Sequence, residues 1–233
     1  MILDILTQRF NTKHWNRDKP ISKETLTYIT DCLHKAPSKM SSVDYKVIIV
    51  TDSETGLEFK KWLFYDHTWN HNGDRAPESS PNDGKRDYNG QYLAPILLVW
   101  LNPIISHTEG IVDGQRVNFP DFMMRQNNIF ISNAIAVLAA GEQGLNTGFG
   151  SCHDPEEVAI KLGFKDYSCP IMLGLGSAAD MIAQVKNDDW LIPVVDPSET
   201  NKILGTCLVN LPSSYEKPNR LLRPAKENMI LIL

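Results

Sequence analysis

The chain has 233 residues, of which 42% are hydrophobic and 22% are charged, and its formal net charge is -5. This is ordinary globular composition, and a chain of this length can bury a substantial core. The negative net charge argues against a broad nucleic-acid surface, because such a surface needs clustered cations. No segment has the roughly 18 apolar residues in a row that a membrane-spanning helix requires, so we expect no membrane contact.

The amino terminus and the cysteines favour a cytoplasmic protein. The first apolar stretch meets Asp4, which is too early for a signal peptide. The four cysteines, Cys32, Cys152, Cys169 and Cys207, form no Cys-x-x-Cys pair and no close cluster. We therefore expect reduced thiols rather than a disulfide framework or a zinc site.

Apolar periodicity predicts the elements of the first part of the chain. Residues 2–10 and 22–33 have apolar side chains at helical spacing, and Ser22 can cap the second of these helices. Residues 45–50 form a short β-branched run that predicts a strand. A third helix is expected at residues 53–64.

The strongest strand and the longest helix follow. Residues 94–101 are apolar at almost every position, which predicts a central strand of a sheet. Residues 121–143 predict a long core helix, which is apolar nearly all round between 129 and 140 and is therefore expected to be buried. Asp154, with Pro155 and two acids after it, is a strong helix start.

The remaining segments are less regular. We expect a glycine-marked turn at 144–150 and a strand that ends in glycines at 169–176. Residues 66–91 and 102–120 are interpreted as two irregular insertions, and long loops of this kind tend to be functional. Residues 195–233 are expected to form an extended tail. Because strands and helices do not alternate regularly, the order of elements favours a single α+β domain over a doubly wound sheet.

Familiar catalytic motifs are absent from the sequence. The glycine-rich segment 148–150 does not continue into Gly-x-Gly-x-x-Gly, since His153 occupies the third glycine position. Ser151 lacks the Gly-x-Ser-x-Gly spacing of a hydrolase nucleophile. His67 and His71 lie in a polar loop that we interpret as solvated rather than as metal-binding. We therefore expect no metal and no dedicated catalytic side chain.

Three separated segments could bind a ligand. Arg9, Asn11 and Lys13 alternate, so an extended chain places two cations and an amide on one side, which suits a phosphate. A solvated surface strand has the same pattern. Residues 36–45 combine a proline with small hydroxyl residues, although alone they are a helix-to-strand loop. Residues 144–156 contain glycine-rich backbone that can present amide N–H groups to a flat ring.

In this order, the segments resemble the FMN-dependent nitroreductase family. Members of that family open with Arg-x-Ser-x-Arg/Lys-x-Phe, and this chain has Arg9-x-Asn11-x-Lys13-x-Trp15. The further matches are a Pro-Ser loop at 37–45, an Ala-Pro strand at 94–99, a Gly-Leu helix end at 144–145, a Pro-apolar-Gly strand at 170–176 and an Arg-Pro element at 220–224. The likeness extends over most of the chain.

The resemblance implies a fold and a cofactor. The expected fold is a mixed β-sheet flanked by helices, in an intertwined homodimer whose extended C-terminal tails (195–233) pack on the partner chain and whose two FMN sites lie at the interface. The residues expected to bind FMN are Arg9, Phe10, Asn11, Lys13, Pro37, Ser38, Lys39, Ser41, Asn89, Phe149, Gly150, Ser151, Arg220 and Arg223.

The resemblance also implies a role for each group of residues. Arg9, Asn11 and Lys13 would hold the ribityl phosphate and the pyrimidine edge, and the arginines at 220 and 223 would complete the phosphate site. Pro37, Ser38, Lys39 and Ser41 would come from the partner chain. Phe149, Gly150 and Ser151 would lie along the flavin, with the Ser151 N–H near N5. Asn89 and Gln91 are the nearest candidates for the pyrimidine contacts.

The implied activity is a ping-pong oxidoreductase. NAD(P)H would reduce FMN, and a nitroaromatic or a quinone would take the electrons. The flavin supplies this chemistry, so the chain needs no acid or base of its own. Two alternatives stay open: a flavin-binding protein without turnover, and a family relative with dehalogenase or flavin-breakdown chemistry. The two insertions are expected to shape the substrate pocket.

Overall fold

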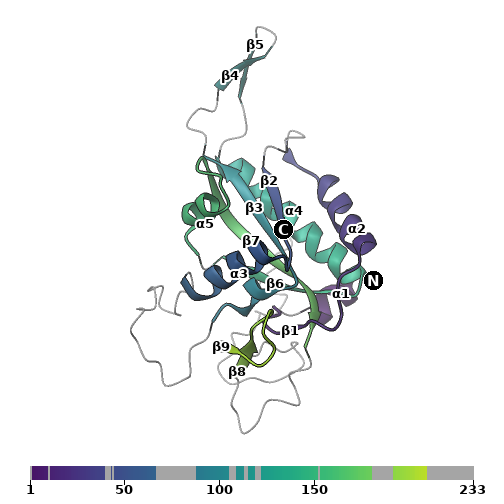
Figure 1. Cartoon of the computed structure of the whole chain (residues 1–233). Coiled ribbons are helices and arrows are strands. Elements are labelled where there is room, and N and C mark those ends of the chain that lie inside the picture. Colours follow the sequence, from purple (N-terminus) through teal and green to yellow (C-terminus); the bar gives the residue numbers. More distant parts are fainter. Residues whose placement is uncertain are drawn as a thin grey trace, which may run out of the picture.

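The computed structural model describes residues 2–9, 11–39, 43, 45–66, 88–104, 109–112, 115–118, 122–151, 153–179 and 191–208. Its helices are α1 (Ile2–Gln8), α2 (Lys23–His34), α3 (Glu54–Asp66), the 3-10 helix η2 (Gly90–Leu93), α4 (Phe122–Glu142) and α5 (Pro155–Lys161). Its strands are β1 (Trp15–Asn16), β2 (Lys46–Val50), β3 (Ile96–Pro103), β4 (Glu109–Val112), β5 (Gln115–Asn118), β6 (Asn146–Gly150), β7 (Tyr167–Ala178), β8 (Leu191–Val195) and β9 (Ile203–Leu208). Figure 1 shows their arrangement.

Side-chain caps start three of the helices, and those at Ser22 and Asp154 are the ones that the sequence predicts. The Ser22 hydroxyl accepts the Thr25 N–H at 3.1 Å before α2. The Ser53 hydroxyl accepts the Gly56 N–H at 3.2 Å before α3. The Asp154 carboxylate accepts two N–H groups of the first turn of α5, each at 3.0 Å. Each cap satisfies donors that the first turn of a helix cannot pair internally.

The central sheet has the strand order β1-β7-β3-β2, and β6 also pairs with β7. All of these described pairs are antiparallel. A parallel bridge between Asn11 and Thr147 adds the N-terminal segment to the sheet. The predicted central strand is confirmed, because β3 lies between β7 and β2 and is buried over nearly its whole length.

The helices cover both faces of this sheet, so the predicted α+β class is confirmed (Figure 1). Side chains alternate along β3: Leu98 and Trp100 face a core built with α2 and α4. Leu97, Val99 and Leu101 face a second core built with α3 and α5. No helix in the described part of the chain combines the length and the apolarity that a membrane crossing needs.

One face of α4 is exposed in the single chain, so the prediction that this helix is buried holds for only part of its surface. Ile129 and Ala136 are fully buried, but Phe130 and Ile131 are 42% and 41% exposed. Met123, near the start of the helix, is 61% exposed. Successive residues of a helix point about 100° apart, so the sheet and α2 can cover only part of an all-apolar helix.

Two segments predicted to be irregular contain strands. The insertion at 102–120 forms the β4–β5 hairpin, which projects from the body of the molecule (Figure 1). The sequence Asp113-Gly114 lies between these strands, and this pair is a strong hairpin signal that the sequence analysis missed. Within 144–150, the turn is confined to Gly144, which has a φ of 72°, and β6 begins at Asn146.

The beginning of the expected tail, residues 195–208, folds onto its own chain, and the packing of the tail on a partner chain stays a prediction. β8 and β9 pair with each other, and their Val194, Leu204 and Cys207 pack with Phe64 and Leu93. The rest of the expected tail, 209–233, and most of the insertion at 66–91 lie outside the described residues.

Candidate functional site

Residues 9–13 of the N-terminal segment run parallel to β6, and the place where they meet β6, which we call the crossing, organises the candidate site. The Thr12 N–H donates to the Thr147 carbonyl at 2.9 Å, beside the Asn11–Thr147 bridge. Farther along, Trp15 pairs with Ala178 at the end of β7. The segment that carries Arg9, Asn11 and Lys13 is therefore fixed against the strand that carries the glycine-rich sequence.

Side chains of the first and third predicted segments meet at the crossing. The Asn11 side-chain oxygen accepts the Phe149 N–H at 2.5 Å. The Arg9 guanidinium lies over the Phe149 ring, 4.5 Å from its centroid, which is a favourable cation–π distance. The structure thus brings Arg9, Asn11 and Phe149 together, although 138 positions separate Asn11 from Phe149 in the sequence.

The η2 helix adds two buried amides to the same place. Asn89 and Gln91 are 9% and 4% exposed, and the Gln91 Nε2 donates to the Asn89 Oδ1 at 3.1 Å. The Lys13 carbonyl lies so close to Gly90 that any side chain there would overlap it. The Trp15 indole N–H donates to the Gly90 carbonyl at 3.0 Å. Asn89 therefore lies next to Gly90, which contacts the Arg9–Lys13 segment.

The glycines of β6 have a structural cause. A Cβ at Gly148 would overlap the Thr12 carbonyl, and a Cβ at Gly150 would overlap the Tyr92 ring. Only glycine allows the N-terminal segment and η2 to approach β6 so closely. The glycines are therefore required by packing of the chain itself, and they are a weaker sign of a flat ligand than the sequence alone suggested.

Three buried polar atoms at the crossing have no hydrogen-bond partner within the described part of the chain. They are the Thr12 hydroxyl, the Thr147 hydroxyl and the Gln91 Oε1. Leaving such an atom unpaired costs about 1–3 kcal/mol. The crossing is therefore suited to a group that offers both donors and acceptors.

The second predicted segment lies elsewhere. Pro37, Ser38 and Lys39 follow α2, and the Lys39 N–H donates to the Asn128 side chain at 2.9 Å, in the first half of α4. The crossing lies near the other end of α4, where α1 packs against Gly141. Within one chain, the structure does not bring these three residues to the crossing.

The other predicted residues fall into two groups. Ser151 is exposed and directly follows β6, so it lies at the crossing with Gly150. Phe10, Ser41, Arg220 and Arg223 lie outside the described residues.

The structure also shows residues that the sequence analysis missed. Tyr92 and His153 are buried and hydrogen-bonded to each other, with 3.0 Å between the Tyr92 hydroxyl and the His153 Nδ1. Their positions are 61 apart, and no local pattern links them. Thr12 and Thr147 were missed for the same reason.

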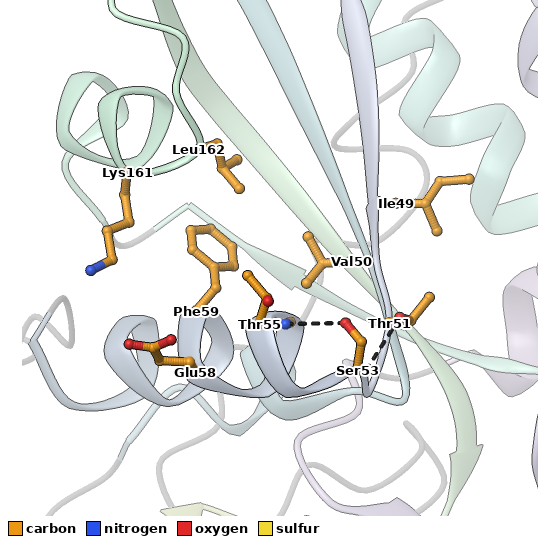
Figure 2. A pocket seen from close by; sticks show the side chains of 10 residues that line it. Ile49, Val50, Thr51, Ser53, Thr55, Glu58, Phe59, Lys161 and Leu162 are labelled. Carbon is orange, nitrogen blue, oxygen red and sulfur yellow. Dashed lines mark hydrogen bonds between the residues drawn. The ribbon is translucent and has the colours of Figure 1, made fainter.

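A cavity of about 350 Å3 lies apart from this site, between β2 and the facing ends of α3 and α5 (Figure 2). Val50, Phe59 and Leu162 give it an apolar lining, and Glu58 and Lys161 lie at its rim. None of the residues predicted to bind a ligand lines it.

Comparison with known proteins gives the fold. No protein-family model matches the chain, and no curated protein matches it either. A nitroreductase family protein from Clostridium novyi NT superposes on 80% of this chain and 89% of its own, with 18% identity and a TM-score of 0.55. A nitroreductase with bound FMN from Bacteroides fragilis NCTC 9343 covers 77% of this chain and 89% of its own, with 18% identity and a TM-score of 0.53.

The chain has the nitroreductase fold. The same fold occurs in iodotyrosine deiodinase bound to FMN and 3-iodo-L-tyrosine, which covers 77% of this chain and 91% of its own, with 19% identity and a TM-score of 0.55. The resemblance stated from the sequence is thus confirmed at the level of the fold.

Proposed function

We propose that the chain is an FMN-dependent oxidoreductase, which takes electrons from NAD(P)H and passes them to a nitroaromatic or quinone-like acceptor. The observation that carries the proposal is the convergence of Arg9, Asn11 and Phe149 beside the buried amides of Asn89 and Gln91. The fold supports it, because two proteins that share it were solved with FMN bound. The free thiols of the described cysteines fit the cytoplasmic location that we expect.

The polar atoms at the crossing fit the pyrimidine edge of a flavin, which carries both donors and acceptors. The Gln91 Oε1 can accept a hydrogen bond, and the hydroxyls of Thr12 and Thr147 can donate or accept one. Arg9 and Lys13 supply positive charge for the phosphate and for the ring. We therefore assign flavin binding to this crossing.

When bound, the flavin supplies the hydride chemistry. The residues of the chain bind and orient it and hold positive charge beside it. A fixed cation such as Lys13 stabilises negative charge that develops next to it. Because the Phe149 N–H is donated to Asn11, we assign the backbone contact with the ring to Gly150 and Ser151.

A second copy of the chain would complete this site. Asn128, which contacts the Lys39 segment, and Gly141, near the crossing, are separated by roughly 20 Å along the axis of α4. In a two-fold dimer with antiparallel α4 helices, Pro37 and Ser38 of one copy would approach the crossing of the other. The exposed apolar side chains of α1 and α4 support this homodimer, because such patches mark interaction surfaces.

The tail can add to the same dimer. β2 is an edge strand among the described strands, and its Ile49 is 39% exposed beside the cavity of Figure 2. Residues 229–233 form an apolar run that we interpret as a terminal strand or packing arm. An exposed edge offers unpaired backbone groups to such a strand. We therefore propose that this run binds along β2 of the partner.

Purification and anaerobic titration test the function. The protein should be yellow, release FMN on denaturation and bleach on addition of NADH or NADPH. A nitroaromatic or a quinone should then restore the colour. A colourless protein that does not bind added FMN would refute the proposal. Binding without bleaching would favour the flavin carrier, and bleaching with turnover only of a halogenated aromatic or of flavin itself would favour the two related chemistries.

Replacing Lys13 tests the location of the site. Lys13→Met should weaken FMN binding about ten- to a hundred-fold, because a hydrogen bond to a charged group contributes about 1.5–3 kcal/mol. Lys19→Met is the matched control, since Lys19 lies in the same segment and is exposed. Fluorescence titration of the apoprotein with FMN measures both affinities. Equal affinities for the two variants would place the flavin elsewhere.

A further inference from the structure

Both ring nitrogens of His153 make hydrogen bonds. The ring is 5% exposed, and its Nε2 lies 2.8 Å from the Cys169 carbonyl. A carbonyl oxygen only accepts, so the Nε2 carries the proton and donates it. The Nδ1 lies 3.0 Å from the Tyr92 hydroxyl, which is its hydrogen-bond partner. The imidazole of His153 is thus held at both nitrogens.

Tyr92 connects this imidazole to the candidate site. It belongs to η2, directly after Gln91, and is fully buried. Its ring packs so closely on Gly150 that a Cβ there would overlap it. The rings of Tyr92 and His153 meet edge-to-face, with 5.9 Å between their centroids. One face of the Gly150 backbone therefore lies directly on the Tyr92 ring, which is bound to His153.

The same pair fixes the backbone of the connection between β6 and α5. Gly150 is the last residue of β6 and pairs with Met172 of β7, and Asp154 caps α5. Ser151 lies between these two fixed points. His153 attaches the connection to the β7 carbonyl of Cys169 and to η2 at once. The direction of the Ser151 backbone therefore depends on these two hydrogen bonds.

We propose that Tyr92 and His153 are positioning residues, which fix the Gly150–Ser151 backbone against the redox ring. The inference rests on the proposed function, since it assigns the ring contact to this backbone. It adds a role for two buried side chains that touch no ligand themselves. Packing alone would need the two rings but neither the hydrogen bond between them nor the one from His153 to Cys169.

The test removes the hydrogen bonds and keeps the rings. Tyr92→Phe loses only the hydroxyl, and His153→Phe keeps an aromatic ring without either nitrogen. Ser132→Ala is the matched control, because it removes another buried hydrogen bond, from the Trp100 indole at 3.2 Å on the opposite face of the sheet. All three variants should lower the melting temperature by similar amounts.

Only the two variants of the pair should change the redox site. We expect their limiting rate of flavin reduction in anaerobic stopped-flow to fall about ten- to a hundred-fold, because small misplacements of reacting groups cost this much. Their flavin midpoint potential should also shift, whereas Ser132→Ala should retain the wild-type rate and potential. Pair variants that match Ser132→Ala in rate and potential would overturn the inference.

The apoprotein separates this inference from the proposed function. In amide NMR spectra without flavin, the Gly150 and Ser151 resonances should move in the Tyr92→Phe and His153→Phe variants and stay in place in Ser132→Ala. Unmoved resonances would refute the positioning role even where wild-type protein binds FMN. A wild-type protein that binds no FMN, but whose variants move these resonances, would refute the proposed function and the contact with a redox ring, and leave only the backbone positioning.

Discussion

At the scale of single residues, Asp196 shows how a buried carboxylate can stay ionised. It is 1% exposed, forms an ion pair with the Lys61 ammonium at 2.8 Å and accepts a hydrogen bond from the Ser198 N–H at 2.8 Å. Burial alone would raise the pKa of its carboxyl group, but the interactions with Lys61 and Ser198 outweigh burial and lower that pKa from 3.8 to about 2. This residue joins the turn after β8 to α3.

Asp196→Asn should therefore destabilise the protein in a pH-dependent way. The ionised carboxylate contributes about 2 kcal/mol to the free energy of unfolding above pH 4, and the contribution is lost as the pH falls towards about 2. Urea unfolding of the wild type and of Asp196→Asn between pH 2 and 7 measures the difference in their free energies of unfolding. Glu199→Gln, at an exposed ion pair with Lys202, should change little at any pH. A difference that is constant with pH would contradict this account.

At the scale of elements, Lys60 ties α3 to the junction of η2 and β3. Its ammonium group is fully buried and donates to the Ala94 and Pro95 carbonyls at 2.7 and 2.9 Å, and to Asp52 at 2.8 Å. Burial lowers the pKa of Lys60 to about 8, although Asp52 acts in the opposite direction. These hydrogen bonds hold the end of η2, the helix that follows Asn89, against α3.

This lowered pKa predicts how stability changes with alkaline pH. Between about pH 8 and 10, the unfolded chain keeps the Lys60 proton and the folded chain releases it, so stability should rise with pH by up to about 3 kcal/mol on this account. Lys60→Gln keeps a hydrogen-bond donor but cannot titrate. The pH dependence of its stability therefore measures the contribution of all other titrating groups. Guanidinium unfolding at pH 7, 8, 9 and 10 measures both proteins. The prediction would be refuted if the free energy of unfolding of the wild type, relative to that of Lys60→Gln, stayed constant or fell with pH.

Elements and site differ in how far the sequence predicts them. Helices α2 and α3 and strand β3 follow from local periodicity and caps, which lie within a few residues. β6 was read as a turn, because its strand character comes from pairing with β7, which begins at Tyr167. The Arg9–Phe149 contact could be anticipated from the family likeness. The Tyr92–His153 pair could not, since it depends on the approach of two distant segments.

At the scale of the whole molecule, the exposed apolar face predicts association. Phe130 of α4 and Leu3 of α1 are 42% and 75% exposed. Phe130→Asp should convert a homodimer into a monomer and weaken FMN binding, because the Lys39 segment would no longer reach the crossing. Ile160→Asp is the control, since Ile160 is 58% exposed on α5. Sedimentation velocity at micromolar concentration measures the oligomeric state of the wild type and both variants. A monomeric wild-type protein, or a dimeric Phe130→Asp variant, would refute the dimer.

The position of β7 also governs the order in which the molecule can be assembled. This one strand pairs with β1, β3 and β6, so contacts between distant parts of the chain converge on Tyr167–Ala178. At a synthesis rate of about 5–20 residues per second, roughly 10–30 seconds separate the making of Trp15 from that of its partner Ala178. The segment with Arg9 and Lys13 likewise has no partner strand until Thr147 of β6 has been made. The first part of the chain to leave the ribosome is thus among the last to reach its native place.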